Sequence, residues 1–241
     1  MKIERVSFDF DKASPLAEKR FISTCGFDLS TTKHKKMMEM GLDVREKGKD
    51  GIKINAIIAP FDGNIFKDHK IVIDGKEIFC NFFEQIPDCS VKGIYFYMLT
   101  AGECFFSSEE NIMDFLYADI WGTNYVDAGI ELLKEKLQED LKTRFSVEEG
   151  KENYLSDEFG PGYFGMPVIE TKKFNEILDG SQIGVKVKES GLIIPQKSCS
   201  GLYLVLNDRN IKFEKDCLKC KGTVSGCQFC KIKKQNEEME G

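Results

Sequence analysis

The sequence lacks several features that assign a chain to a common functional class. No apolar run reaches the roughly 18 residues that a membrane-spanning helix needs. Positive charge is not in excess, since 34 Lys and Arg stand against 40 Asp and Glu, a net charge of −6. Nucleic acids and anionic membranes both reward positive charge, so neither is expected as a partner. The chain has only two histidines, His34 and His69, far from Cys199 in the sequence, which disfavours a Cys–His catalytic pair.

The N-terminus also lacks the apolar core of a signal peptide, because Met1–Arg5 leads directly into alternating polar and apolar residues. We therefore expect a cytoplasmic protein, and in that reducing compartment its nine cysteines are not expected to form disulfides. A chain of 241 residues can bury a core without such cross-links.

The first hundred residues predict strands with two helices among them. Alternation at Val6, Phe8 and Phe10 indicates a strand, and Ser14-Pro15 indicates a helix over 16–22 with Pro15 near its first turn. The other expected elements are an exposed helix within 33–50, a hairpin of Ile71-Val72-Ile73 and Ile78-Phe79 around Asp74-Gly75, and a buried central strand over 94–99.

Two helices are expected next, separated at Gly122. Ser107 and Glu110 form a capping-box pattern for the first, whose apolar face is Ile112, Phe115, Leu116 and Ile120. The second carries Val126, Ile130, Leu133, Leu137 and Leu141 on one face. A Gly- and Pro-rich loop is predicted over 146–167, followed by a helix over 171–178 with Gly180 as its C-cap and by strands at 183–187, 192–194 and 202–206. Strands, then helices, then strands predict an α+β fold.

The sharpest local motif is a cluster of cysteines near the C-terminus. Cys217, Cys220, Cys227 and Cys230 form two C-x-x-C pairs, which can each hold one side of a metal centre. Four thiolates suit an iron–sulfur cluster or tetrahedral zinc, and the spacing does not decide between them. The alternative is a set of four free thiols without a metal, which is disfavoured because exposed thiols are readily oxidised.

Two further segments have side chains suited to ligand binding. Residues 159–165 combine glycines, which permit close backbone approach, with Tyr163, which offers a ring face and a hydroxyl. Residues 195–201 combine small polar residues with Lys197 between two expected strands. Each segment is equally compatible with an ordinary turn.

Five segments, taken in order, resemble the reactivation domain of cobalamin-dependent methionine synthase in a stand-alone form. The resemblance covers residues 85–206, so we expect a reactivation-like domain over 1–210 and a Cys-rich metal-binding tail over 211–241. The matching segments are Thr100-Ala101-Gly102, residues 118–123, Gly160-Pro161-Gly162-Tyr163, Ile183-Gly184-Val185 with Lys188-Glu189-Ser190, and residues 195–201.

The resemblance implies a C-shaped α+β domain around a twisted antiparallel sheet with flanking helices. It implies that S-adenosylmethionine binds in a shallow groove and that the domain docks over the corrin of a methionine synthase core or a related corrinoid protein. Cob(II)alamin would then be reduced by an electron from ferredoxin or flavodoxin and remethylated, with the protein positioning the cofactors. No catalytic side chain is expected. The cofactor-binding residues implied are Glu158, Gly160, Pro161, Gly162, Tyr163, Glu189, Lys197 and Ser198.

The sequence departs from the family at one position. The family's Arg-x-x-Pro-Gly-Tyr segment uses its Arg to hold the carboxylate of S-adenosylmethionine, and the aligned residue here is Glu158. This replaces a bidentate clamp with repulsion. Either another cation supplies the contact, Arg144 being far upstream, or S-adenosylmethionine is not a ligand.

The resemblance also suggests a role for the cysteine tail. Iron–sulfur clusters reach potentials below about −400 mV, so a [4Fe–4S] cluster could deliver the electron to cobalt. A binding or regulatory protein with a zinc knuckle on the same scaffold is the main alternative. A conventional methyltransferase ranks last, because no Gly-rich loop follows an early strand.

Overall fold

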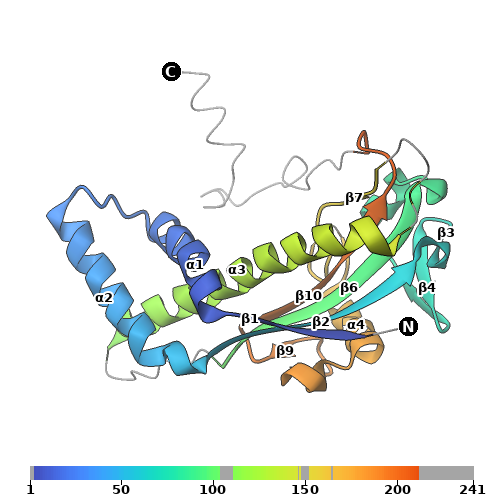
Figure 1. The fold of residues 1–241 in the computed structure, drawn as a ribbon. Coiled ribbons are helices and arrows are strands. Elements are labelled where there is room, and N and C mark those ends of the chain that lie inside the picture. Colours follow the sequence, from blue (N-terminus) through green and yellow to red (C-terminus); the bar gives the residue numbers. More distant parts are fainter. Residues whose placement is uncertain (1–2, 104–110, 146, 148–151, 164, 212–241) are drawn as a thin grey trace, which may run out of the picture.

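The computed structural model describes residues 3–103, 111–145, 147, 152–163 and 165–211. These residues form the expected C-shaped α+β fold, in which a long antiparallel sheet is flanked by helices (Figure 1). The predicted metal ligands Cys217, Cys220, Cys227 and Cys230 lie outside the described residues. The helices are α1 (Phe10–Cys25), α2 (Thr32–Gly48), α3 (Ile112–Arg144) and α4 (Thr171–Leu178).

The main sheet has five strands in the order β1-β2-β6-β10-β7, each antiparallel to its neighbours. There are two smaller sheets, one of three strands in the order β3-β4-β5 and one in which β8 pairs with β9. The strands are β1 (Glu4–Phe8), β2 (Ile52–Asp62), β3 (Phe66–Lys67), β4 (Lys70–Ile73), β5 (Lys76–Ile78), β6 (Val91–Gly102), β7 (Tyr154–Leu155), β8 (Lys186–Val187), β9 (Ile193–Ile194) and β10 (Ser198–Leu206).

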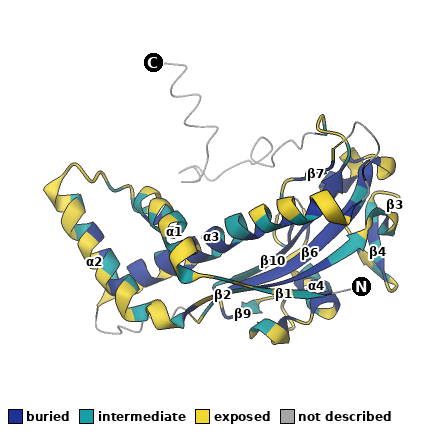
Figure 2. Cartoon of the chain, in the orientation of Figure 1, coloured by how far each residue is buried: buried dark blue, intermediate teal, exposed yellow. Residues whose placement is uncertain are grey.

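β6 is the central strand that the apolar run over 94–99 predicts, and all six of those residues are buried. Tyr95 and Tyr97 pack in a core shared with α1, α2 and α3, whereas Phe96 and Met98 pack in a second core on the opposite face. α4 contributes Phe174 to that second core. Because both faces are covered, the strand is apolar without alternation (Figure 2).

The N-terminal strand and helices form where predicted, but α1 begins earlier than expected. Asp9 is its N-cap and accepts a hydrogen bond from the Asp11 N–H, so Pro15 lies inside the helix and not in its first turn. Gly26 closes α1 with a left-handed φ of 64°. In α2, the side chain of Thr31 caps the first turn by accepting from the His34 N–H.

The predicted break at Gly122 is wrong, because α3 runs without interruption from Ile112 to Arg144. Its N-cap is Asn111, while Ser107 and Glu110 lie outside the described residues. At Gly122 and Gly129 the side chains of other segments pack directly against the backbone of α3. A Cβ on Gly129 would lie 2.8 Å from the Ile54 side chain.

The predicted apolar face of the first half of α3 is also wrong. Ile112, Phe115 and Leu116 are 82%, 61% and 47% exposed. The helix instead buries Tyr117 and Trp121. None of the helices in the described part of the chain is long and apolar enough to cross a membrane.

The hairpin between β4 and β5 is confirmed, with Asp74 at φ 48° and Gly75 at φ 77°. α4 also forms as predicted, but Asp179, at φ 55°, is its C-cap in place of Gly180. The segment 195–201 is not simply a turn, because β10 already begins at Ser198. The Gly- and Pro-rich loop contains the short strand β7.

Candidate functional site

A groove of about 730 Å³ runs along the free edge of β10, and it is the best candidate for a binding site. β7 pairs only with Val205 and Leu206, and Phe159 bridges Leu202. The Leu202 N–H donates to the Phe159 carbonyl. Every second residue of a strand directs its N–H and C=O to the same edge, so the backbone groups of Ser200 and Ser198 also face the groove edge. Beyond the bridge, the described residues place no strand on this edge.

Segments far apart in the sequence form the walls of the groove. α3 presents residues spaced i, i+3, i+4 and i+7, and Arg20 reaches in from α1. The lining residues are Arg20, Thr123, Val126, Asp127, Ile130, Glu158, Pro161, Tyr163, Val168, Thr171, Gly191, Leu192, Ile193, Gln196, Lys197, Ser198, Cys199 and Ser200. Val126 and Ile130, predicted as core positions, are thus half-buried groove residues.

Most of the predicted cofactor-binding residues meet at this groove. Five of them line it directly, namely Glu158, Pro161, Tyr163, Lys197 and Ser198. Gly160 lies against β10 so closely that a Cβ would be 2.8 Å from the Ser200 carbonyl oxygen, which explains the glycine. Gly162 has a left-handed φ of 91° between Pro161 and Tyr163.

Glu189 does not line the groove. Its side chain is 95% exposed and accepts a hydrogen bond from Lys172 Nζ at 2.5 Å. This ion pair holds the pKa of Glu189 below its usual value. The nearby residues Gly191 and Leu192 line the groove in its place.

Glu158 is a half-buried carboxyl group that contacts two tyrosines of the sheet. Tyr97 donates a hydrogen bond to its Oε1, and the Tyr203 hydroxyl interacts with the same carboxyl. Burial raises the pKa of Glu158, against the opposing effects of these hydroxyls and of Lys134. No Lys or Arg in the described part of the chain lies within ion-pair distance of it.

Lys197 is already neutralised within the structure. Its Nζ donates to Asp119 Oδ1 at 2.6 Å and to Thr123 Oγ1 at 3.0 Å. The aliphatic part of the side chain lies over Gly122, where a Cβ would be 2.8 Å from Lys197 Cγ. The glycine thus leaves room for the lysine to lie against this face of α3.

Arg20 of α1 and Asp127 of α3 are two groove residues that no sequence motif indicated, and the packing of the two helices brings them together. Arg20 Nη2 donates to Glu131 Oε2 at 2.9 Å, and its Nη1 lies 3.9 Å from Asp127 Oδ2. Burial raises the pKa of Asp127, with Arg20 opposing the shift. The sequence did offer one indication, because Asp127 shares a helical face with Val126 and Ile130, and a charged residue there argues against a buried face.

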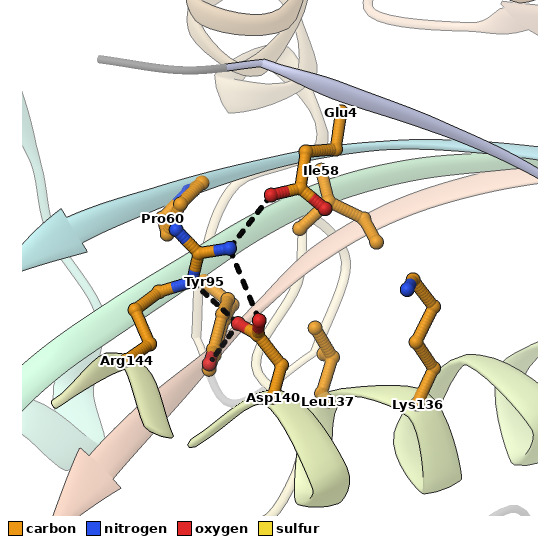
Figure 3. Close-up of a pocket in the computed structure, with 8 residues that line it drawn as sticks. All are labelled: Glu4, Ile58, Pro60, Tyr95, Lys136, Leu137, Asp140 and Arg144. Atoms are coloured by element: carbon orange, nitrogen blue, oxygen red, sulfur yellow. Dashed lines mark hydrogen bonds and ion pairs between the residues drawn. The ribbon is translucent and has the colours of Figure 1, made fainter. Parts of the chain in front are cut away.

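Arg144 does not reach the groove, so it does not supply the contact that the family's arginine makes. It lies in a separate cluster with Asp140 and Glu4, at Nε–Oδ2 2.5 Å and Nη2–Oε1 2.6 Å (Figure 3). Tyr95 donates to Asp140 at 2.7 Å. Although burial opposes them, these hydrogen bonds hold the pKa of Asp140 below its usual value. The cluster ties β1, β6 and α3 together.

The cysteines of the described chain do not form a metal site. Cys25, Cys80, Cys89 and Cys199 form no disulfide within the described residues, and burial raises the pKa of Cys199 well above its usual range. A group with this shift is a poor nucleophile and metal ligand at neutral pH. No group of three or more His, Cys, Asp or Glu suited to a metal ion occurs in the described ranges.

No protein-family model matches the chain, and no curated protein is detectably similar to it in sequence. Among solved structures, the crystal structure of the MetH reactivation domain bound to AdoHcy aligns with a TM-score of 0.67. The alignment covers 89% of this chain and 81% of that domain. The chain has the MetH reactivation domain fold. At 14% sequence identity the similarity establishes the architecture, and it confirms the expected C-shaped sheet with flanking helices.

Proposed function

We propose that this protein is a reactivation component for a corrinoid protein of a methionine synthase or a related corrinoid methyltransferase. The observation that carries the proposal is the shared fold with a domain crystallised with AdoHcy, together with an open groove where five predicted ligand-binding residues meet. The protein acts as a positioning scaffold, because the chemistry belongs to the cofactors.

The groove is suited to an adenosyl ligand by its shape and lining. Tyr163 is 70% exposed at the groove, so its ring is free to stack on a planar base. The backbone groups of Ser198 and Ser200 offer hydrogen-bonding partners along the edge of β10. Leu192 and Val168 add apolar surface. An S-adenosylmethionine-type ligand is therefore the proposed occupant.

The corrinoid is carried by the partner in this proposal. When bound, S-adenosylmethionine would supply the methyl group for remethylating the partner's corrinoid, once an external donor had provided one electron. The residues of this chain would hold and orient the adenosyl ligand in the groove. Ferredoxin or flavodoxin is the proposed source of the electron.

The cysteine tail is proposed to bind a metal centre that relays this electron. Cys217, Cys220, Cys227 and Cys230 have the spacing for a [4Fe–4S] cluster, with zinc as the alternative. Anaerobic purification of the full chain is expected to give a brown protein with visible absorbance near that of such clusters. The Cys220→Ser variant should lose this absorbance, whereas Cys89→Ser, which removes an exposed thiol elsewhere, should keep it. A colourless protein with one tightly bound zinc would overturn the electron-relay role.

The reactivation activity is tested with a corrinoid protein in the cob(II) state. The full chain, S-adenosylmethionine and a low-potential reductant are expected to remove the cob(II) EPR signal and to produce methylcobalamin absorbance. Tyr163→Ala should slow this conversion at least about tenfold, because it removes the exposed ring of the groove. Tyr154→Phe is the matched control, since Tyr154 lies on β7 and contacts Arg209 outside the groove. Loss of the EPR signal at the same rate without the protein would contradict the proposal.

A further inference from the structure

The two cations of the groove are already satisfied by carboxylates of the protein. Lys197 pairs with Asp119 at 2.6 Å, and Arg20 pairs with Glu131 at 2.9 Å. Asp119 and Glu131 do not line the groove, so each cation directs its charged group to a partner outside the lining. A ligand anion would have to compete with these existing pairs.

The two carboxylates that line the groove, Asp127 and Glu158, are less fully neutralised than its two cations. Among the described residues Asp127 has one ion-pair partner, Arg20, at the long distance of 3.9 Å, and that arginine makes its shorter contact with Glu131. Glu158 has hydroxyl partners and no ion pair in the described part of the chain. A positive charge placed in the groove would stabilise the ionised form of both carboxyl groups, because an opposite charge favours that form.

Ser200 provides a second, independent sign that a ligand belongs in the groove. The residue is 8% exposed and lines the groove, and its Oγ has no hydrogen-bond partner among the described residues. A buried hydroxyl without a partner carries a desolvation cost, and polar atoms of this kind are uncommon in folded proteins. A polar group of a bound ligand would satisfy it.

We propose that this groove selects adenosyl ligands that carry positive charge and no free carboxylate, with Glu158 and Asp127 receiving the cationic end. The inference rests on the proposed function, because it assumes an adenosyl ligand. It implies an order of affinity in which decarboxylated S-adenosylmethionine binds most tightly, S-adenosylmethionine less tightly and AdoHcy least. Among these ligands the carboxylate opposes binding and the sulfonium favours it.

The test is titration calorimetry of the full chain with decarboxylated S-adenosylmethionine, S-adenosylmethionine and AdoHcy at low ionic strength. The decarboxylated ligand is expected to bind at least about tenfold more tightly than S-adenosylmethionine, since close charges in a partly buried site interact strongly. Glu158→Gln and Asp127→Asn should each reduce this ratio severalfold. Glu176→Gln is the control, because it removes a negative charge on α4 that pairs with Lys76 outside the groove.

The outcomes separate the inference from the function on which it rests. Binding of S-adenosylmethionine as tightly as, or more tightly than, the decarboxylated ligand would overturn the charge selection and leave the adenosyl site standing. An unchanged ratio in both groove variants would also overturn it. Failure of all three ligands to bind the folded protein would overturn the adenosyl site and the selection together. Thermal unfolding of each variant establishes that it is folded, and the two separate substitutions guard against a local defect in either one.

Discussion

The side chain of Lys197 lies directly over Gly122, and a Cβ at that glycine would come within 2.8–3.0 Å of Lys197 Cγ, Cδ and Cε. Lys197, the residue just before β10, thus lies along one face of α3 and reaches Asp119, one turn before Gly122 on that face. This contact explains a glycine inside a continuous 33-residue helix. It also positions one of the two cations at the groove.

Gly122→Ala is expected to displace Lys197 without unfolding the protein. Alanine favours the helix by about 1 kcal/mol, and a flexible lysine can move aside, so the free energy of unfolding should change by less than about 1 kcal/mol. The lysine should lose its contact with Asp119, which frees a cation in the groove. We therefore expect S-adenosylmethionine to gain affinity relative to its decarboxylated form. Thermal unfolding and calorimetry measure the two effects, and a large loss of stability would contradict the explanation.

Ser200→Ala should affect stability and binding in opposite directions. The unliganded protein is expected to become more stable by up to about 1 kcal/mol, because the buried Oγ has no hydrogen-bond partner in the described part of the chain. Ligand affinity should fall about 3- to 10-fold, since the ligand loses a hydrogen bond. Ser190→Ala, at an exposed turn position, is the control and should change neither quantity. Weaker folding with unchanged binding would show that the hydroxyl has a structural role.

Gly41→Ala should destabilise the packing of α1 and α2 against α3. Phe21 stacks on Trp121 with ring centroids 3.9 Å apart, and Trp121 Nε1 donates to the Gly41 carbonyl oxygen at 2.7 Å. A Cβ on Gly41 would lie 2.8 Å from the buried Phe21 ring. We expect a loss of about 1–3 kcal/mol in the free energy of unfolding, measured by urea denaturation.

A double-mutant cycle checks the cause of that loss. In a Phe21→Leu background, the ring that crowds Gly41 is absent, so Gly41→Ala should cost clearly less. Equal costs in both backgrounds would assign the effect to something other than the ring.

Asp140→Asn should weaken the cluster that joins α3 to β1, with a defined pH dependence. The pKa of Asp140 is held below its usual value by Arg144 and Tyr95, although burial opposes this. The carboxylate therefore stabilises the fold above its unfolded pKa, and this contribution is lost as the pH falls through the folded pKa. We expect the variant to be less stable by about 1–2 kcal/mol at pH 7.

The difference between Asp140→Asn and the native chain should shrink as the pH falls from about 5 to 3. Urea denaturation across this range measures it. Glu139→Gln, on the exposed neighbouring position, should show little difference at any pH. A difference in the free energy of unfolding that stays constant with pH would mean that the charge of Asp140 does not stabilise the folded state.

Local patterns predicted the elements whose cause is local. Asp74-Gly75 sets the β4–β5 hairpin, since both residues adopt positive φ values. The apolar run over 94–99 indicates β6, which is buried on both faces. The errors occur where distant segments meet. Gly122 reads as a helix break in the sequence, but it accommodates Lys197 inside the helix.

The sequence by itself determined the α+β class and the central strand, because alternation, apolar runs and turn residues are local properties. Its resemblance to the methionine synthase reactivation domain pointed to five of the residues that meet in the groove. Tertiary structure alone decided the charge of the groove. It brought Arg20 and Asp127 together from α1 and α3, and it held Arg144 away with Asp140 and Glu4. It also left the Ser200 hydroxyl without a hydrogen-bond partner among the residues that the structure describes. Ion pairs and burial depend on how separate elements pack, and no spacing along the chain records that packing.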